Sequence, residues 1–182
     1  MPRPPRAQAL ALWQQLNGEY ERYQAAVRVL PVTQLKIQDD MRRYLCLRCA
    51  GFLEQVTFEV LSGYLNQKGG GPMYAFATSW FNQAPNLNAK AFAKLIGRFG
   101  RTHAAQFEDF LTPPRRESLG DLLGIRNDVA HGKVATGQRL QPDRYIQLCE
   151  DVYDWLIATF LAESVEVLAD TGTSVLAYER SV

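Results

Sequence analysis

The feature that most constrains the fold is a run of apolar residues at helical spacing between residues 40 and 66. One side of the expected helix carries Leu45, Cys49, Phe52, Val56 and Val60, and another side carries Leu47, Phe58 and Leu61. A helix that is apolar nearly all round must be covered on more than one side. The segment therefore predicts a long central helix, capped by Asp39 or Asp40, with one face on its own core and the other available to a second subunit.

Six further segments carry apolar residues at helical spacing, and prolines or glycines separate them. The spacing predicts helices over residues 8–30, 73–83, 88–99, 102–111, 117–131 and 143–163. Asn88 and Thr102 are the side chains that we expect to cap two of these helices. We therefore expect an all-α bundle of five or more helices. A length of 182 residues suits a single domain, residues 1–182, with a core over about 35–164 and a tail over 165–182.

The cysteines bear on cofactors and on the cellular compartment. Cys46, Cys49 and Cys149 are an odd set, and only His103 and His131 could add imidazole ligands. No second Cys-x-x-Cys pair exists, so we expect three buried thiols and no metal or other cofactor. His103 is expected at the surface, at a helix start. Reduced cysteines are typical of a cytoplasmic protein.

The sequence shows no membrane or export signal. No uninterrupted apolar run reaches the roughly 18 residues of a membrane helix. The first six residues, MPRPPR, are not followed by the apolar region of a secretory signal. We therefore expect no membrane partner.

The segment most informative about function is the hexapeptide Arg126-Asn127-Asp128-Val129-Ala130-His131, which ends one predicted helix. Arg126 falls in the middle of an apolar stripe formed by Leu119, Leu122, Leu123, Val129 and Ala130. A guanidinium keeps its proton, so on a buried face it needs an anion or another polar partner. Asn127 and His131 share a neighbouring face, and Gly132 is a natural helix stop. A fixed cation, a titratable imidazole and an amide are therefore expected close together.

This hexapeptide resembles the signature of the HEPN superfamily, an Arg followed after four to six residues by a His. Residues 43–54 resemble the long first core helix of its RiboL-PSP-type branch, and residues 123–132 resemble the signature helix, so the likeness covers roughly residues 35–160. The resemblance implies a HEPN-like helical bundle that forms a two-fold homodimer, with the paired motifs facing each other across the interface. Many such domains are metal-independent ribonucleases. The residues that the resemblance marks as catalytic are Arg126, His131 and Asn127, and those that it marks as supporting are Asp128, Arg48 and Glu54.

These residue types suit RNA cleavage without a metal. RNA carries its own nucleophile, the 2′-OH, so the reaction needs a base, an acid and positive charge on the developing phosphorane. His131 can move a proton near pH 7, and Arg126 can hold two phosphate oxygens. Asn127 can orient His131 or donate to the phosphate. The expected function is a metal-independent endoribonuclease resembling defence or toxin effectors, with RNA, a second copy and an antitoxin or other regulatory protein as partners.

Charge is unevenly distributed along the chain. The net charge is +1, but residues 1–93 carry a balance of +4, residues 94–144 one of +3, and residues 145–182 one of −6. The expected RNA-binding side chains in or beside the motif helix are Arg115, Arg116 and Lys133. Arg115 and Arg116 fit a solvated helix start equally well.

Two other interpretations stay open. In the first, the domain is a non-catalytic HEPN module that binds RNA or a protein. In the second, the motif is structural: Arg126 pairs with a buried carboxylate, for which Glu54 on the central helix is the candidate, and His131 merely ends a helix.

Overall fold

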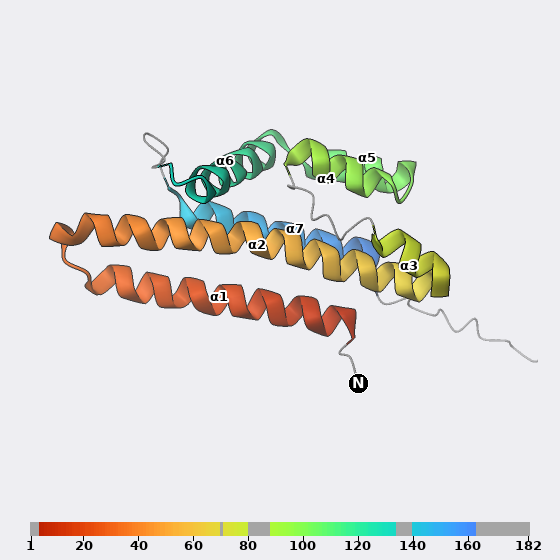
Figure 1. The fold of residues 1–182 in the computed structure, drawn as a ribbon, viewed down its shortest axis with the longest axis horizontal. Helices are drawn as coiled ribbons and strands as arrows, with labels where there is room; N and C mark the ends of the chain where they lie inside the picture. The colour runs from red at the N-terminus through yellow and green to blue at the C-terminus, as the bar shows by residue number, and fades with distance from the viewer. Residues whose placement is uncertain (1–3, 70, 80–87, 134–139, 163–182) are drawn as a thin grey trace, which may run out of the picture.

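The computed structural model describes residues 4–69, 71–79, 88–133 and 140–162, and within these ranges the chain is helical, with no strand (Figure 1). The helices are α1 (Pro5–Val29), the short 3₁₀ helix η1 (Val32–Gln34), α2 (Leu35–Lys68), α3 (Gly71–Ser79), α4 (Ala89–Gly97), α5 (Arg101–Phe110), α6 (Pro113–Ala130) and α7 (Pro142–Phe160). The all-α prediction is confirmed. None of the described helices combines the length and the apolar character needed to cross a membrane.

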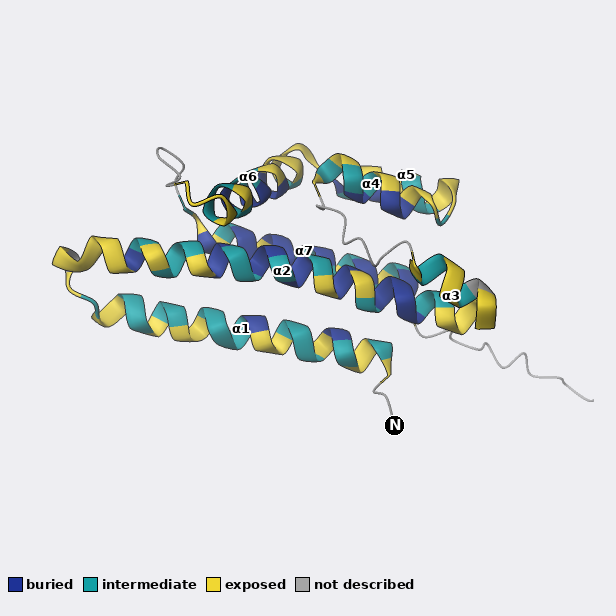
Figure 2. Ribbon diagram, viewed as in Figure 1, coloured by how far each residue is buried: buried dark blue, intermediate teal, exposed yellow. Residues whose placement is uncertain are grey.

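Helix α2 is the central element, as its all-round apolar pattern predicts. It packs against α1 on one side, α7 behind and α6 above, while α4 and α5 lie over the other half of the molecule (Figure 1). All five residues of its predicted core face are buried: Leu45, Cys49, Phe52, Val56 and Val60. The second predicted face is only partly right, because Leu61 is fully buried while Phe58 is 39 % exposed. Figure 2 shows exposed segments along α2 between its buried turns.

The three cysteines are buried and unbonded, as predicted. The Sγ atom of Cys149 lies 3.6 Å from the backbone oxygen of Cys49, which joins α7 to α2. Burial raises the pKa of Cys46 to about 12 and raises that of Cys149 well above 9. The Cys46 and Cys149 thiols therefore stay protonated, and the three buried cysteines serve as small apolar groups of the core.

The predicted start of α2 is wrong. The helix begins at Leu35, after η1, so Asp39 and Asp40 lie inside it rather than capping it. The two carboxylates instead form ion pairs one turn along, with Arg42 at 2.9 Å and with Arg43 at 2.8 Å. An N-cap residue must itself have non-helical backbone. Because the chain turns helical at η1 and continues into α2, Asp39 and Asp40 have helical backbone and cannot be caps.

Two other starts differ and one agrees. Helix α5 begins at Arg101, so Thr102 lies within it and Gly100 occupies the N-cap position. Helix α6 begins at Pro113 rather than at residue 117, because proline has no amide hydrogen and fits the first turn of a helix. The Asn88 cap is confirmed, since its side chain accepts a hydrogen bond from the Ala91 amide at 2.8 Å.

At its C-terminal end, α7 stops at Phe160 rather than near residue 163 as predicted. The predicted end of the helix over 73–83 and the tail over 165–182 lie outside the described residues.

His103 is not a simple surface residue. Its ring is half-buried and stacks on Phe160 with a centroid separation of 5.1 Å, and its Nδ1 lies 3.1 Å from the carbonyl oxygen of Phe99. Tyr64 and Trp155 pack edge-on against the ring of Phe160 in the same cluster. His103 therefore helps to join α5 to α7.

Candidate functional site

The C-terminal end of α6 is closed by a specific backbone arrangement. The Lys133 amide donates to the carbonyl of Asp128 at 2.8 Å, and the Gly132 amide donates to that of Val129 at 3.1 Å. Gly132 has φ +67°, a left-handed conformation that favours glycine. This pair of hydrogen bonds is a Schellman motif, which satisfies the last carbonyls of the helix. The predicted stop at Gly132 is confirmed, and the backbone of His131 is fixed at the C-cap.

Arg126 emerges from the side of α6 that faces α2. The buried residues of the helix are Ser118, Leu119, Leu122, Leu123 and Ile125. Of the predicted stripe, Val129 is half-buried and Ala130 is exposed, because the last turn of α6 extends past its neighbours. The Arg126 side chain is 33 % exposed. The guanidinium is thus placed at the rim of the α2–α6 contact.

Glu54 of α2 is the partner of Arg126. The Nη1 atom of Arg126 lies 3.0 Å from Oε1 of Glu54, and Nη2 donates a hydrogen bond to Oε2 at 3.3 Å. Oε1 is buried and receives no well-aligned hydrogen bond within the described part of the chain. Burial raises the pKa of Glu54, and the attraction of Arg126 offsets this only in part. The pair expected by the structural interpretation exists, but the carboxylate is incompletely satisfied.

The remaining motif residues differ in exposure. His131 and Asn127 are exposed and Asp128 is half-buried. The Asn127 carbonyl accepts the His131 amide at 3.0 Å, and among the described residues no hydrogen bond joins their side chains. Asp128 takes part through its backbone carbonyl in the helix end. His131 is therefore open to a ligand or to another protein chain.

Arg48 lies away from this group. Its Nε donates to Oε2 of Glu19 at 2.6 Å and its Nη2 donates to Oε1 at 3.0 Å, so it fastens α2 to α1. The hydrogen bond to Glu19 raises the pKa of Arg48. Six residues of helix separate Arg48 from Glu54 and turn the two side chains toward different neighbours. The structure thus brings Glu54, but not Arg48, to Arg126.

The two arginines at the start of α6 also lie apart from the motif. Arg115 pairs with Asp151 at 2.8 Å and stacks over the ring of Phe110, and Arg116 pairs with Glu108. Eleven residues of helix, about 16 Å, separate Arg115 from Arg126. Lys133 is exposed and follows the motif directly. Of the three expected RNA-binding residues, only Lys133 lies beside His131.

Sequence reasoning missed the residue that fastens α6 to α7. Arg144 donates from Nε to Ser118 Oγ at 2.6 Å and from Nη1 to Asp121 Oδ2 at 3.0 Å, and its Nη2 lies 3.1 Å from Glu117. The signal was an arginine in the first turn of α7, where a helix dipole disfavours positive charge. This network holds α6 while its C-terminal end remains exposed.

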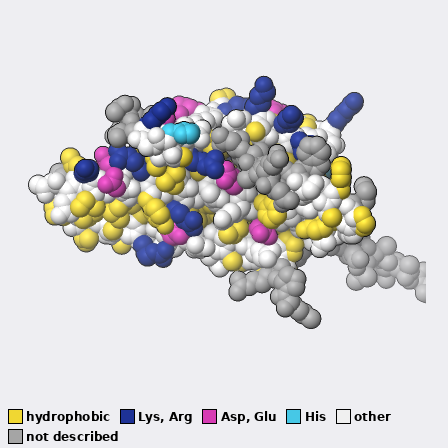
Figure 3. Space-filling view, viewed as in Figure 1, with side chains coloured by type: hydrophobic (Ala, Val, Ile, Leu, Met, Phe, Trp, Pro, Cys, Tyr) yellow, Lys and Arg dark blue, Asp and Glu magenta, His cyan; other side chains and the backbone are white. Residues whose placement is uncertain are grey.

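An apolar stripe remains exposed on α2. Ile37, Tyr44 and Phe58 are 48 %, 57 % and 39 % exposed. With Gly51, where an added Cβ would meet nothing within 4 Å, they recur every seven residues. Ile37 and Tyr44 also line a groove of about 570 Å³ between α1 and α2. Figure 3 shows hydrophobic side chains along this face, with charged groups between them.

Among the described residues no group of three or more His, Cys, Asp and Glu side chains could hold a metal ion. The structure brings together Arg126 and Glu54, with His131, Asn127 and Lys133 at the adjoining helix end. No family model, curated protein or solved structure matches this chain.

Proposed function

We propose that this chain is a metal-independent endoribonuclease that acts as a two-fold homodimer, with the Arg126–His131 ends of two copies forming one composite site. The observation that carries the proposal is the end of α6, where a Schellman motif fixes the backbone of the exposed His131, five residues after Arg126, whose guanidinium lies at the rim of the α2–α6 contact. A proton carrier and a phosphate-binding group are thereby held on one rigid element.

The reaction uses the 2′-OH of RNA as the nucleophile. A base removes the 2′-OH proton, the 2′-oxygen bonds to phosphorus, the bond from phosphorus to the 5′-oxygen breaks, and an acid protonates that oxygen. The products are a 2′,3′-cyclic phosphate and a free 5′-OH. His131 of one copy serves as the base and His131 of the other as the acid. Arg126 binds the non-bridging oxygens as charge develops on them.

The need for two imidazoles is the reason for the dimer. Each copy of the motif contains one histidine, His131. The other histidine of the chain, His103, stacks on Phe160 in the aromatic cluster and does not belong to the site. In an isologous dimer a residue meets its own copy only near the two-fold axis, so His131 lies near that axis. The stripe of Ile37, Tyr44 and Phe58 supplies the apolar contact, because seven-residue spacing is typical of packed helices. Gly51 at its centre allows two α2 helices to approach closely.

Glu54 holds Arg126 in place until RNA binds. Its carboxylate accepts one aligned hydrogen bond at 3.3 Å, and burial raises its pKa, so the grip is weaker than that of a fully hydrogen-bonded ion pair. A phosphate that offers two charge-assisted hydrogen bonds competes well for the same guanidinium. Glu54 is therefore a positioning residue in this proposal.

One observation favours a second candidate, a non-catalytic module that binds RNA or a protein. Arg126 already has an acidic partner within its own chain, as a structural arginine would. In that case the exposed end of α6 and the α2 stripe bind a partner and catalyse no reaction.

The experiment compares wild-type protein with His131→Ala on labelled single-stranded RNA in EDTA. We expect cleavage with 2′,3′-cyclic phosphate ends, and a loss on the order of 10²- to 10⁴-fold in the variant. His103→Gln is the matched control, because it removes the histidine outside the motif and should leave cleavage unchanged. A contaminating ribonuclease would respond to neither substitution. Cleavage that needs added Mg²⁺, or an undiminished rate in His131→Ala, overturns the proposal. RNA binding without cleavage favours the second candidate.

The composite site has its own test. Sedimentation velocity at micromolar concentration should show a dimer, and Tyr44→Asp in the α2 stripe should convert it to a monomer that does not cut RNA. Tyr44 is 57 % exposed, so the substitution leaves the core intact. An active monomer would contradict the composite site.

A further inference from the structure

Helix α4, the turn after it and the first residue of α5 carry an exposed basic surface. Its cations are Lys90, Lys94, Arg98 and Arg101, all exposed, and we call this set the α4 ridge. The sequence contains no Asp or Glu between Glu59 and Glu108. The positive charge of the ridge therefore has no acidic neighbour along the chain.

Lys90, Lys94 and Arg101 of the ridge differ from the arginines that build the fold. The arginines that form ion pairs between described residues include Arg42, Arg43, Arg48, Arg115, Arg116, Arg126 and Arg144. Lys90, Lys94 and Arg101 form no ion pair with any described residue. Lys90 and Lys94 lie one turn apart on the same face, where like charges repel each other. An anionic ligand along this face would relieve that repulsion.

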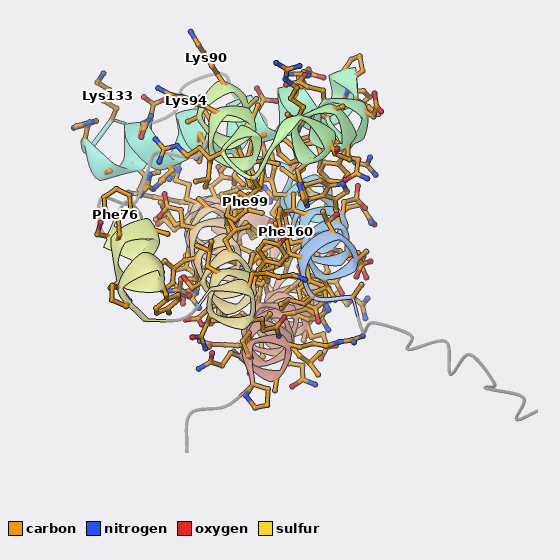
Figure 4. All side chains as sticks on the ribbon, turned by 90° about the vertical axis from the view of Figure 1, so that its right-hand side faces the viewer. Phe76, Lys90, Lys94, Phe99, Lys133 and Phe160 are labelled. Atoms are coloured by element: carbon orange, nitrogen blue, oxygen red, sulfur yellow. The ribbon has the colours of Figure 1, made fainter. Side chains whose placement is uncertain are left out.

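The ridge is mounted on a rigid support. The opposite side of α4 buries Phe92, Leu95 and Ile96. Just beyond α4, Phe99 packs against Phe160 of α7 at 5.2 Å. Figure 4 shows Lys90 projecting outward from α4, whereas Phe99 and Phe160 lie inside the molecule. The amino groups are thus presented to solvent from a fixed helix.

We infer that the α4 ridge binds the phosphate backbone of single-stranded RNA and extends the RNA-binding surface beyond the motif. This rests on the proposed function, which makes RNA the substrate. A row of cations suits a polymer with regularly repeated negative charge. Helix α4 contacts α6, and Lys90, Lys94 and Lys133 lie at the same outer edge of the molecule in Figure 4. Figure 3 likewise shows Lys and Arg side chains recurring along the edge formed by α6 and α4.

This assignment replaces the expected role of Arg115 and Arg116. Arg115 is engaged with Asp151 and Arg116 with Glu108, and both donate hydrogen bonds to backbone carbonyls at the end of α5. An RNA strand would have to break those contacts to use them, whereas Lys90 and Lys94 need only lose water. The ridge is therefore the better anionic-polymer surface.

The test measures binding without cleavage. A fluorescein-labelled, 2′-O-methylated oligoribonucleotide is titrated with wild-type protein and with Lys90→Gln/Lys94→Gln over a range of salt concentrations. We expect the double variant to bind on the order of 10-fold more weakly at 0.1 M salt, and the slope of log K against log salt to fall by about 1.4. Gln is a good helix former, so α4 should persist.

The matched control removes the same charge elsewhere. Arg28→Gln/Lys36→Gln lies at the exposed α1–α2 turn, where both side chains also form no ion pair with a described residue. We expect nearly wild-type binding in this control. Equal weakening in both double variants, or no binding by the wild type, overturns the inference, as does tight binding of an acidic peptide in place of RNA. A parallel assay uses unmodified RNA of the same sequence. Cleavage of it by the wild type, with unchanged binding in the Lys90→Gln/Lys94→Gln variant, refutes the ridge alone, and ridge-dependent binding with no cleavage of the unmodified RNA refutes the nuclease alone.

Discussion

Two arginine–glutamate pairs anchor neighbours to α2, and they are built differently. In both pairs the arginine side chain is 33 % exposed. Glu19 accepts two hydrogen bonds from Arg48, at 2.6 and 3.0 Å, and a third from Gln15 at 3.4 Å. Glu54 accepts one aligned hydrogen bond from Arg126, at 3.3 Å, and its buried Oε1 accepts none within the described residues.

The difference separates a structural clamp from a candidate site. The Glu19 carboxylate accepts hydrogen bonds through both oxygens, so charge-assisted hydrogen bonding stabilises the α1–α2 contact. The Glu54 carboxylate loses water without full replacement, and the rise of its pKa expresses that cost. In the proposed function, the α2–α6 contact is therefore the one at which a phosphate competes with a carboxylate for the guanidinium.

The largest expected difference in stability is between Glu19→Gln and Glu54→Gln. Glu19→Gln keeps the shape of the side chain but removes the charge that accepts two short hydrogen bonds, and should cost about 2 kcal/mol. Glu54→Gln relieves the burial of a charge and should cost less than about 1 kcal/mol. Urea unfolding at pH 7 measures both. Equal costs would show that the two pairs are equivalent.

The helix end that presents His131 gives a second contrast. Gly132→Ala places a side chain at φ +67° and should destabilise by about 1 kcal/mol through backbone strain, since an added Cβ meets nothing within 4 Å. Gly120→Ala lies within the same helix, exposed and equally unobstructed, and should stabilise by about 0.5 kcal/mol. Thermal unfolding distinguishes them, and a stabilising Gly132→Ala would count against the Schellman end.

The smallest expected effect is the pH dependence that Glu54 contributes. Its folded-state pKa lies above the ordinary 4.5, so the folded protein holds this proton more tightly than the unfolded chain. The resulting stability is fully present below pH 4.5 and is lost as the pH rises through the raised value. Relative to Glu54→Gln, wild-type protein should therefore become less stable across this window. A difference that stays constant from pH 4 to 7 would contradict the raised pKa.

Much of the fold follows from apolar periodicity. The central helix and the buried cysteines were predictable. The pairing of Arg126 with Glu54 was predictable in the structural interpretation of the motif, because a helix buried on several sides leaves a charged stripe residue few possible partners. The stop at Gly132 was predictable too, since a single residue type fits its left-handed backbone.

The failures concern choices that depend on the surroundings. Asp39, Asp40 and Thr102 are all capable caps, but neighbouring turns had already started the helices. Arg48 matched a position in the first core helix, yet its rotation about α2 turns it toward Glu19. Arg115 and Arg116 were predicted to be available for RNA because the sequence does not show their partners. Asp151 lies on α7, far along the chain from Arg115, and Glu108 lies on α5, the helix before Arg116. Such pairings are set by tertiary packing, which sequence spacing does not encode.

The most direct measurement is single-turnover cleavage of single-stranded RNA in EDTA by Arg126→Lys and Arg48→Lys side by side. Lysine keeps the charge but cannot form two parallel hydrogen bonds to a phosphate. The comparison of the two pairs predicts a loss on the order of 100-fold for Arg126→Lys and wild-type cleavage for Arg48→Lys. Equal rates for the two variants, whether both high or both low, would contradict the assignment of Arg126 to phosphate binding.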